Sequence, residues 1–588
     1  MRVGADTGGT FTDVVAADGS IAKVPSTPDD PGTAVRSGTD ALGGRPDVLA
    51  HGTTVATNAL LERKGATVAL VATSGLADVI EIARQDRPSL YDSDAIRPAP
   101  LVPRHLRFEV DGRLDAAGVE LVAVGDVPDV GSVGAIAVCL LHADLNPAHE
   151  RAIGDALRAA GHDVTCSSEI APEMREYERT VTTVVNAYLR PACGDYLRGL
   201  TDVADDVLVM TSAGGLVPID RGADVPASLL LSGPAGGVRA AAAIARACGF
   251  PDAVTFDMGG TSTDVCLVLD GAPAPAAERE VAGFPVRLPS MDIHTIGAGG
   301  GSIARLDAGG ALRVGPESAG AVPGPACYGR GGVAPTVTDA DLVAGRIDPD
   351  VAFPGIGALD VDAARTALAA ANVTADGVIA VVDAEMERAI RAVTVERGVD
   401  PRPLALVAFG GAGPLHACAL ADAIGMDVVI VPPRAGVLSA VGLLCAPVQR
   451  DFVRSWPTPI DHDGMEDAHI ALAITASAAV GGGATVDLGL DCRYEGQSHE
   501  LTVANLEDFE DEHRRRNGYA RPGAPIEVVA LRARATALAP LDITDLPAPA
   551  REAVVGPAVV AEPDCTVWVP DGWRADVGEV GAWILRRA

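Results

Sequence analysis

Lysine is almost absent from this chain. Only Lys23 and Lys64 occur among 588 residues, so arginine carries nearly all of the positive charge. The 79 Asp and Glu outnumber the 46 Lys and Arg, and the formal net charge is −33. A protein this acidic is repelled by nucleic acid and by anionic membrane surfaces. We therefore expect neither as a partner, and an anionic ligand needs local backbone dipoles and a metal cation to bind here.

Paired cysteines and long apolar runs are missing as well. The ten cysteines lie singly between Cys139 and Cys565 without a CxxC pair, a spacing that fits neither a disulfide framework nor an iron–sulfur cluster. No run of 18 apolar residues occurs, and the N-terminal MRVGADTGG has no apolar signal core. We expect reduced thiols and a cytoplasmic protein.

Aromatic residues make up only 3% of the chain, whereas glycine and proline are plentiful at 66 and 42. That balance suits an enzyme with many loops and tight turns. The length exceeds what one hydrophobic core holds and suggests roughly three or four domains.

One segment occurs twice. ADTGGTFTDVV (5–15) and FDMGGTSTDVC (256–266) are identical at seven of eleven positions. Equivalent residues, such as Asp6 and Asp257, are 251 residues apart. The offset is too large for a solenoid repeat and fits a duplicated domain. Both copies follow an apolar run and precede another, so each predicts a strand, a tight turn and a second strand.

The Gly-Gly tips of these hairpins predict a phosphate site. Glycine lets backbone N–H groups approach a ligand closely, and the threonines add hydroxyl donors. Aspartates do not bind phosphate directly, so Asp6 and Asp257 indicate a Mg²⁺ ion between protein and polyphosphate. We expect neither lysine to lie near either motif, so backbone, hydroxyls and Mg²⁺ must neutralise the phosphates. The predicted ATP-binding residues of the two hairpins are Thr7, Gly8, Gly9, Thr10, Thr12, Asp13, Gly259, Gly260, Thr261, Thr263 and Asp264.

A third glycine cluster, AFGGAGPLHA (408–417), follows the apolar run PLALVAF and opens a stretch with helical spacing. Strand, glycine loop and helix N-terminus together form a nucleotide-binding arrangement, although the same pattern occurs in plain tight turns. Beside two phosphate hairpins, it predicts the adenosine and ribose wall, with Gly410, Gly411 and Gly413 flanking the nucleoside.

This set of motifs resembles the actin/hexokinase-like ATPase superfamily, in which two duplicated α/β domains close over Mg·ATP. Longer stretches resemble the hydantoinase A/5-oxoprolinase family: HGTTVATNALLERKGATVALVATSGLADVIEIARQDRPSLYD (51–92), REYERTVTTVVNAYLRP (175–191), LLSGPAGGV (230–238), MDIHTIGAGGGSIA (291–304), GPESAGAVPGPACYGRGG (315–332) and VPPRAGVLSAVGLL (431–444). DLGLDCRYEGQSHELTV (487–503) and GPAVVAEPDCTVWVPDGWRADV (556–577) resemble its C-terminal β-rich domain.

The resemblance implies an α/β fold with duplicated actin-like (ribonuclease H-like) ATPase domains, an interdomain nucleotide cleft and a small β-rich C-terminal domain. The expected domains are 1–190 with the first hairpin, 191–452 with the second hairpin and the adenosine loop, and 453–588. It also implies a hetero-oligomer with a hydantoinase B-type subunit, of which this chain shows no trace.

The chemistry implied is ATP-dependent hydrolysis of a cyclic amide such as a hydantoin, 5-oxoproline or another lactam. Asp6 and Asp257 are the expected catalytic residues, orienting Mg²⁺ and its waters. The alternative is the ATPase subunit of an acetone- or acetophenone-type carboxylase, which the sequence does not separate from the first reading. A non-catalytic regulatory ATPase is a third class. Reductase activators need paired cysteines that are missing here.

Other residues are candidates for substrate or a second metal. Asp292 and His294 lie two apart, so on a strand both face one side, a geometry suited to a second divalent metal. His51 could join them or contact substrate. Glycines 297–301, with Gly299 at the centre, could cradle substrate or make a turn. Arg179 could clamp an anion or simply pair with Glu176. Arg87 could line the mouth of the site together with Tyr91.

Overall fold

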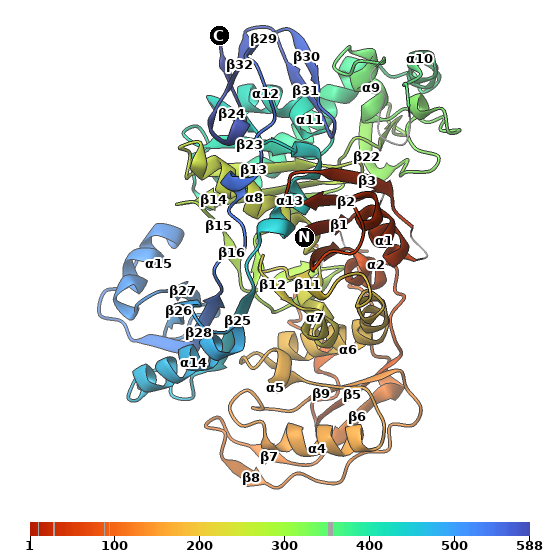
Figure 1. Cartoon of the computed structure of the whole chain (residues 1–588). Coiled ribbons are helices and arrows are strands. Elements are labelled where there is room, and N and C mark those ends of the chain that lie inside the picture. The colour runs from red at the N-terminus through yellow and green to blue at the C-terminus, as the bar shows by residue number, and fades with distance from the viewer. Residues whose placement is uncertain (10, 28–29, 88, 93, 351–356) are drawn as a thin grey trace.

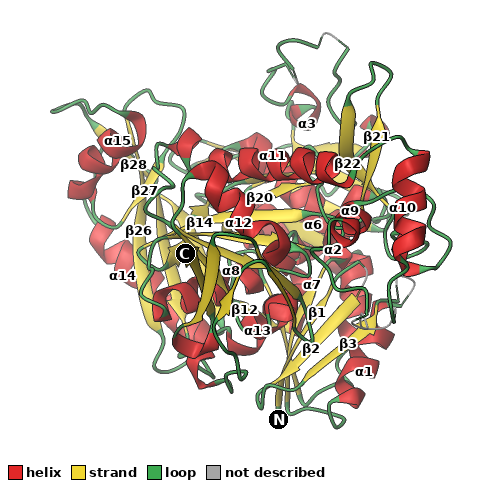
Figure 2. Ribbon diagram, turned by 90° about the horizontal axis from the view of Figure 1, so that it is seen from above, coloured by secondary structure: helices red, strands yellow, loops and turns green. Residues whose placement is uncertain are grey.

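The computed structural model describes residues 1–9, 11–27, 30–87, 89–92, 94–350 and 357–588 (Figure 1). Seen from above, long strands run through the centre and helices cover them on the outside (Figure 2). The fold is mixed α/β, with several sheets that combine parallel and antiparallel pairs.

The first repeat lies in a six-stranded sheet with the order β12-β11-β4-β1-β2-β3. Successive residues of β1 face opposite sides of this sheet, as alternation requires. Helix α13 packs closely over Gly4, while α1 covers Val14 on the other face through Gly38. Two strands of this sheet come from beyond residue 190, the predicted domain boundary. The bounds are β1 Arg2–Thr7, β2 Phe11–Ala16, β3 Ile21–Pro25, β4 Val48–Thr53, β11 Asp206–Met210, β12 Leu216–Pro218, α1 Pro31–Ala41 and α2 Val55–Leu61.

The second repeat lies in a nine-stranded sheet with the order β15-β14-β13-β23-β24-β33-β32-β29, and β20 also pairs with β14. In both sheets the hairpin is antiparallel and its first strand pairs in parallel with a later strand, β4 or β23. The elements are β13 Ala253–Met258, β14 Thr263–Leu269, β15 Ala272–Pro273, β20 Ile293–Ile296, β23 Ala405–Phe409, β24 Val428–Val431, α9 Val337–Val343, α10 Val361–Ala370, α11 Ala375–Val393 and α12 Gly413–Ile424.

The end of the chain completes this second sheet. Strand β33 pairs with β24, β32 pairs with β33, and the hairpin of β30 and β31 packs on α12. Strands from the predicted β-rich domain 453–588 therefore join more than one sheet, because hydrophobic alternation identifies strands but not the sheet that each one joins. The bounds are β29 Val554–Val555, β30 Ala558–Ala561, β31 Thr566–Val569, β32 Trp573–Val577 and β33 Trp583–Arg587.

Strands β30 and β31 pair with each other in a two-stranded sheet, and the earlier part of that region forms a separate four-stranded sheet with the order β25-β28-β26-β27. It lies to one side of the molecule in Figure 1, covered by α14 and α15. The bounds are β25 Gln449–Ser455, β26 Thr485–Tyr494, β27 Leu501–Val503, β28 Ile526–Thr536, α14 Met465–Val480 and α15 Phe509–Asn517.

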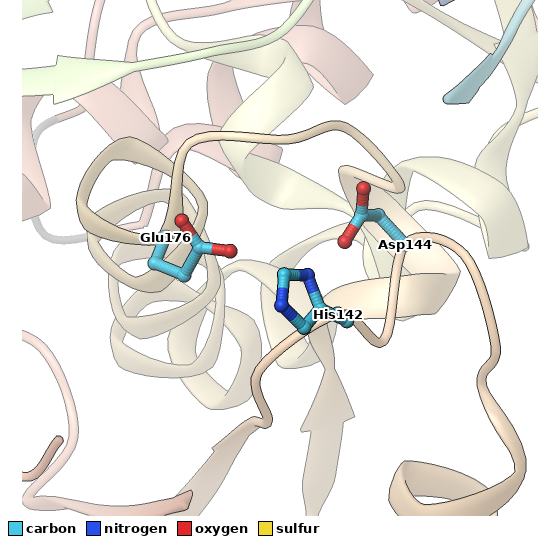
Figure 3. Close-up of side chains that lie close together, drawn as sticks. All are labelled: His142, Asp144 and Glu176. Atoms are coloured by element: carbon cyan, nitrogen blue, oxygen red, sulfur yellow. The ribbon is translucent and has the colours of Figure 1, made fainter. Parts of the chain in front are cut away.

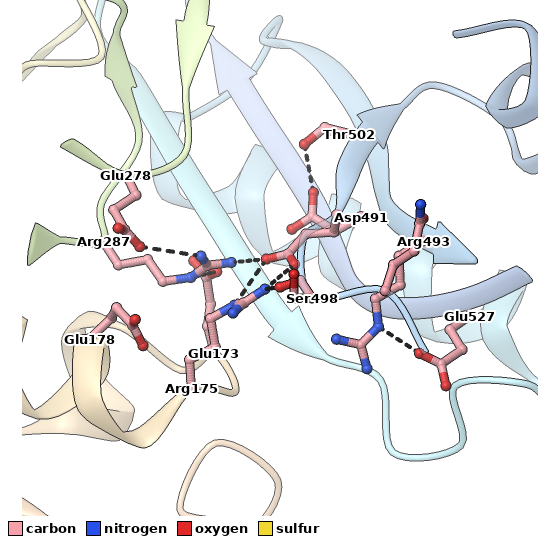
Figure 4. A network of polar contacts seen from close by, with 12 residues as sticks. Glu173, Arg175, Glu178, Glu278, Arg287, Asp491, Arg493, Ser498, Thr502 and Glu527 are labelled. Carbon is pink, nitrogen blue, oxygen red and sulfur yellow. Dashed lines mark hydrogen bonds and ion pairs between the residues drawn. The ribbon is translucent and has the colours of Figure 1, made fainter. Parts of the chain in front are cut away.

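A buried ion network joins this sheet to the rest of the protein (Figure 4). Arg287 lies 2.8 Å from Glu173 and 2.5 Å from Glu500, and Arg532 bridges Glu173 and Asp491. Each charge has an opposite partner, which buried charges require. The network fixes three distant chain segments to one another.

Two helices connect the main sheets, α8 (Gly233–Ala247) and α13 (Leu438–Cys445). They cross where Gly236 meets Gly442, and a Cβ on Gly442 would lie 1.8 Å from the carbonyl oxygen of Gly236. Glycine is required for that close approach. The crossing holds the two sheets in a fixed relation.

A second four-stranded sheet, with the order β10-β9-β5-β6, lies at the lower end of Figure 1. Helix α6 packs on this sheet and also against α2. Strands β7 and β8, β17 and β18, and β21 and β22 form three small hairpins. The remaining bounds are β5 Val68–Thr73, β6 Arg107–Val110, β7 Arg113–Leu114, β8 Glu120–Val122, β9 Ala135–Cys139, β10 Val164–Cys166, β16 Pro275–Ala276, β17 Arg279–Val281, β18 Phe284–Val286, β19 Ser290–Met291, β21 Ser302–Leu306, β22 Leu312–Ser318, α3 Val79–Ile82, α4 Ala148–Ala159, α5 Ser167–Ile170, α6 Glu176–Arg198 and α7 Ile219–Asp224.

Within the described residues, no single helix has the length and hydropathy of a membrane span. One sharply bent pair, Val361–Ala370 with Ala375–Arg397, reaches those values together by length and composition only.

Candidate nucleotide site

The two repeats form hairpins of the same register. Asp6 is paired with Asp13 in the first, and Asp257 with Asp264 in the second. Both turns close through the same bond, from the first glycine N–H to a carbonyl three residues on: Gly8 to Phe11 and Gly259 to Ser262, each 3.0 Å. The predicted strand–turn–strand structure is thus confirmed in both copies.

Each hairpin presents a row of polar residues across three neighbouring strands. Residues directly opposite in adjacent strands point to the same face of a sheet. In the first row Asp6, Asp13 and Lys23 follow one another across β1, β2 and β3. In the second row Asp257, Asp264 and Thr295 do so across β13, β14 and β20.

The four carboxylates of the two rows lie close enough to influence one another. Burial, followed by the charge of Asp13, raises the pKa of Asp6 to about 7. Burial raises the pKa of Asp264 to about 6, and burial together with the other three carboxylates raises that of Asp257 well above its usual range. Convergent carboxylates that resist ionisation form a donor set suited to a hard divalent cation.

Lys23 corrects the expectation that no lysine lies near the motifs. Its ammonium is 2.7 Å from Asp13 Oδ1, and its charge also lowers the pKa of Asp6. The missed signal was the Asp18–Gly19 turn between β2 and β3, a frequent hairpin sequence whose centre sets residue 13 opposite residue 23.

The two glycine tips are held by different groups. The Ser26 hydroxyl donates to Gly8 O at 2.7 Å in the first tip. In the second tip, N–H groups of Gly300 and Gly301 donate to the carbonyls of Gly259 and Gly260, at 3.0 and 2.7 Å. The run 297–301 therefore packs its backbone against the second tip.

Close packing explains the glycine at position 299. A Cβ there would lie 2.7 Å from the backbone nitrogen of Thr261 and 2.9 Å from Gly259 O, so a larger residue does not fit. Gly299 contacts the second hairpin directly, and its predicted contact with substrate stays a prediction.

The threonines of the hairpins divide into two groups. Thr12 and Thr263 are fully buried. Thr263 donates to Ala298 O, and Thr12 lies within hydrogen-bond distance of Thr7 and Ser26. These hydroxyls support loops, whereas Thr261 is exposed at its tip. Thr10, the counterpart of Thr261, lies outside the described residues.

The third glycine cluster lies directly beside the second hairpin. Gly410 follows β23 with φ +79°, and a Cβ there would lie 2.4 Å from Asp257 Oδ1. The Ala412 N–H donates to Met258 O, and α12 begins at Gly413. Gly411 is exposed on the loop. The predicted strand–glycine loop–helix is therefore present, next to a site carboxylate.

The segment LLSGPAGGV (230–238), at the start of α8, lies beside a carboxylate of the first hairpin. A Cβ on Gly233, the first residue of α8, would lie 3.9 Å from Asp6 Oδ1. The preceding Ser232 is fully buried, and among the described residues its hydroxyl has no hydrogen-bond partner. Sequence analysis did not assign this residue to the site.

His51 is next to Asp6 in register but is closed to ligands. Its Nδ1 donates to Ala5 O at 3.0 Å, so its Nε2, 2.8 Å from the Tyr196 hydroxyl, accepts that proton. Burial lowers the pKa of His51 to about 4. The side chain is a neutral structural link between β4 and α6.

The proposed Asp292–His294 metal pair is engaged otherwise. Both carboxylate oxygens of Asp292 bind the guanidinium of Arg397. Among the described residues, the sets of three ligand side chains that converge lie elsewhere: His142 with Asp144 and Glu176, and Glu562 with Asp564 and Cys565.

Arg179 lies beside the first of these sets. Figure 3 shows the His142 imidazole between the Asp144 and Glu176 carboxylates. Arg179 is fully buried, donates to Asp144 at 2.6 Å and lies 3.9 Å from Glu176. The expected pairing with Glu176 is therefore present but long, and Asp144 is the closer partner.

Arg87 is exposed on the loop after α3, and Tyr91 is 99% exposed. A cavity of about 240 Å³ lies close to this loop, lined by Glu81, Arg97, Tyr177 and apolar side chains. Tyr177 and Tyr196 are nineteen residues apart on α6, which separates them by roughly 28 Å. Since Tyr196 contacts His51 beside Asp6, this cavity is remote from the hairpins.

Comparison with known proteins identifies the family of the chain. Residues 2–161 match the hydantoinase/oxoprolinase N-terminal region, and residues 179–452 match hydantoinase/oxoprolinase. The chain is 34% identical to caprolactamase subunit alpha of Pseudomonas jessenii over 98% of this chain and 97% of that protein. It is 36% identical to 5-oxoprolinase 1 of Arabidopsis thaliana over 77% of this chain, but spans only 42% of that protein.

Solved structures show the same likeness. The crystal structure of ATP-dependent caprolactamase from Pseudomonas jessenii matches with a TM-score of 0.85, at 31% identity and over the full length of both chains. A nucleotide-free acetone carboxylase matches with a TM-score of 0.77 at 23% identity, which supports the fold alone.

Proposed function

We propose, from the premise that the chain belongs to the hydantoinase/oxoprolinase family, that it is an ATP-dependent subunit that phosphorylates a cyclic amide to drive ring opening. The observation that carries the proposal is the pair of equal hairpins whose carboxylates converge beside the Gly410 loop and the start of α8. Full-length similarity to a caprolactamase favours a lactam as the substrate class.

The chemistry starts from the stability of an amide. Resonance removes electrophilicity from the carbonyl carbon, so water attacks it slowly. When the carbonyl oxygen attacks the γ-phosphorus and the bond to ADP breaks, the product is an imidate phosphate. Water then adds to the activated carbon, the ring C–N bond breaks as the nitrogen takes up a proton, and the ring opens to an acyl phosphate. A second water hydrolyses this acyl phosphate to a carboxylate and inorganic phosphate. The protein contributes positioning and charge stabilisation.

Asp6 and Asp257 would hold Mg²⁺ through its waters, with Asp13 and Asp264 behind them. When bound, the cation shields the phosphate charge from the carboxylates and withdraws electron density from the phosphoryl group. Because the N–H groups of Gly8 and Gly259 close the turns, the Gly8–Gly9 and Gly259–Gly260 tips would bind the phosphates through the N–H groups of Gly9 and Gly260. The loop of Gly410, Gly411 and Gly413 flanks the nucleoside, where the N-terminus of α12 favours negative charge.

A partner completes the proposed assembly. The caprolactamase relative is a subunit alpha, and an acetophenone carboxylase relative, 35% identical over 74% of this chain, is a gamma subunit. By the same logic we propose a hetero-oligomer with a hydantoinase B-type subunit that shares in shaping the substrate pocket.

Phosphate release from Mg·ATP tests the proposal. The purified chain, with and without the co-purifying partner, is assayed with 5-oxoproline, hydantoins, caprolactam, and acetone plus bicarbonate. We expect stimulation by one cyclic amide, abolished in Asp257→Ala and retained in the surface variant Lys64→Met. Stimulation by ketone and bicarbonate alone moves the protein to the carboxylases. Absence of turnover with the partner present refutes the mechanism.

A further inference from the structure

The outermost position of each polar row differs between the two halves. In the first row it is Lys23, whose ammonium contacts Asp13 at 2.7 Å. In the second row it is Thr295, whose hydroxyl donates to Asp264 Oδ1 at 2.5 Å. A hydroxyl satisfies one oxygen but brings no charge, whereas the ammonium neutralises its carboxylate.

Lys23 is well supported in this position. Its stem lies on β3 directly opposite Asp13, and its ammonium is 5.2 Å from the centre of the Phe11 ring. Both members of the pair are mostly buried, at 20% and 18% exposure, so solvent screens the pair only in part. The chain has one other lysine, Lys64, which lies just beyond α2 and pairs with Glu62 in solvent.

The charges of the two rows are therefore unequal. Each row carries two carboxylates, but only the first carries a cation of its own. Buried carboxylates without a counter-charge are unfavourable, and like charges side by side make them more so. The second row lacks a protein cation among its described neighbours and needs one from outside.

We infer that Lys23 acts as the built-in cation of the first row and excludes a divalent cation from Asp13. The nucleotide site then takes up a single divalent cation, which is drawn toward Asp257 and Asp264. Lys23 is thus a positioning residue that sets both the number and the side of the metal. The inference rests on the proposed nucleotide site and explains why the two rows of that site differ in charge.

Counting bound Mn²⁺ tests this without any turnover. The full chain is titrated with Mn²⁺ at saturating ADP, and free Mn²⁺ is read by electron paramagnetic resonance. The counts for protein without ADP and for ADP without protein are both subtracted, to remove surface binding and Mn·ADP in solution. We expect one ADP-dependent ion in the wild type and two in Lys23→Met. Lys23→Arg keeps the charge and should return the count to one, and Lys64→Met should leave it unchanged.

Moving the cation to the other row gives the converse test. Thr295→Lys places an ammonium beside Asp264 and should weaken ADP-dependent Mn²⁺ binding at least tenfold, while Thr295→Ala should change it less than threefold. These variants leave the Lys23 pair intact, so they remain informative if Lys23→Met does not fold.

The outcomes separate the two proposals. If ADP does not bind to the wild type, the proposed nucleotide site fails. If ADP binds with one Mn²⁺ and Lys23→Met also binds one, Lys23 only joins β2 to β3 and the inference is overturned. A Thr295→Lys variant that binds Mn²⁺ as tightly as the wild type overturns it as well.

Discussion

The two halves of the nucleotide site share a backbone and differ in what surrounds it. Both hairpins have the same register, the same turn bond and a glycine packed against a carboxylate, Gly52 beside Asp6 and Gly410 beside Asp257. Yet the first tip is held by one serine hydroxyl, and the second by two backbone N–H groups. The two copies thus share the hairpin geometry, while the groups beside them give each copy a different charge and a different support.

The largest difference between the two halves is expected when a carboxylate is removed. We expect Asp257→Ala to lower the rate of ATP hydrolysis about 10³-fold and Asp6→Ala about 10²-fold, within the range for lost electrostatic stabilisation. The difference arises because Asp6 has Lys23 near it, whereas the described residues place no lysine or arginine charge beside Asp257. Phosphate release at saturating Mg·ATP measures both, with thermal melting as the check on folding. Equal losses would show that the halves are catalytically equivalent.

Acid should unfold the first half selectively. His51 has a pKa of about 4 in the fold, below the value of about 6.5 in an unfolded chain. Its stabilising effect is therefore complete above pH 6.5 and is lost as the pH falls toward 4, by roughly 3 kcal/mol. In the second sheet the corresponding position is Ala408, opposite Phe256, which does not titrate.

Urea unfolding at pH 7.5, 5.5 and 4.5 measures this effect. His51→Gln should flatten the pH dependence, whereas His499→Gln, on the exposed surface of the separate sheet, should leave it as in the wild type. A wild-type stability that does not fall between pH 6.5 and 4 would contradict the assignment of a neutral, buried imidazole.

The second tip should tolerate no added atom. Gly299→Ala places a Cβ within 3 Å of three backbone atoms, and overpacking of this kind costs about 2 kcal/mol. We expect a lower melting temperature and weaker ADP binding. Gly482→Ala is the matched control, because a Cβ there meets nothing within 4 Å. An unchanged ADP affinity in Gly299→Ala would mean that the tip does not need its clamp.

The first tip should be the more tolerant one. Ser26→Ala removes the hydrogen bond to Gly8 O, worth about 1 kcal/mol, together with a longer contact to Thr12, so we expect roughly fivefold weaker ADP binding. Isothermal titration with Mg·ADP measures it, and Ser26→Thr, which keeps the hydroxyl, should restore most of the affinity. A loss as large as that of Gly299→Ala would remove the distinction between the tips.

Sequence was informative where the signal was local. The hairpins, their tips and the Gly410 loop follow from short runs of glycine between apolar segments, and the structure contains each of them. Lys23 was also predictable in principle, since one turn fixes its register. Domain limits remain predictions, although the two large sheets take strands from both sides of residues 190 and 453.

Other contacts depend on distant segments and carried no local signal. Thr295 reaches Asp264 through a strand that returns after a long excursion, and His51 finds Tyr196 from the far end of a helix. Asp292 was predicted to be a metal ligand because its actual partner, Arg397, is more than a hundred residues away in the sequence and the local pattern gives no sign of it. Such pairings are decided by how whole sheets pack, which the alternation of residues along one strand does not encode.

The place of β33 inside the second sheet has a consequence for how the protein is made. A ribosome has supplied every strand of the first sheet once residue 218 has emerged, whereas β24, an apolar VVIV strand, lacks one neighbour until Trp583–Arg587 appears. Through that interval its edge is open to pairing with other chains. The half that holds Asp257 is therefore completed later in synthesis than the first sheet, and a nascent chain depends on Trp583–Arg587 to protect this edge from aggregation.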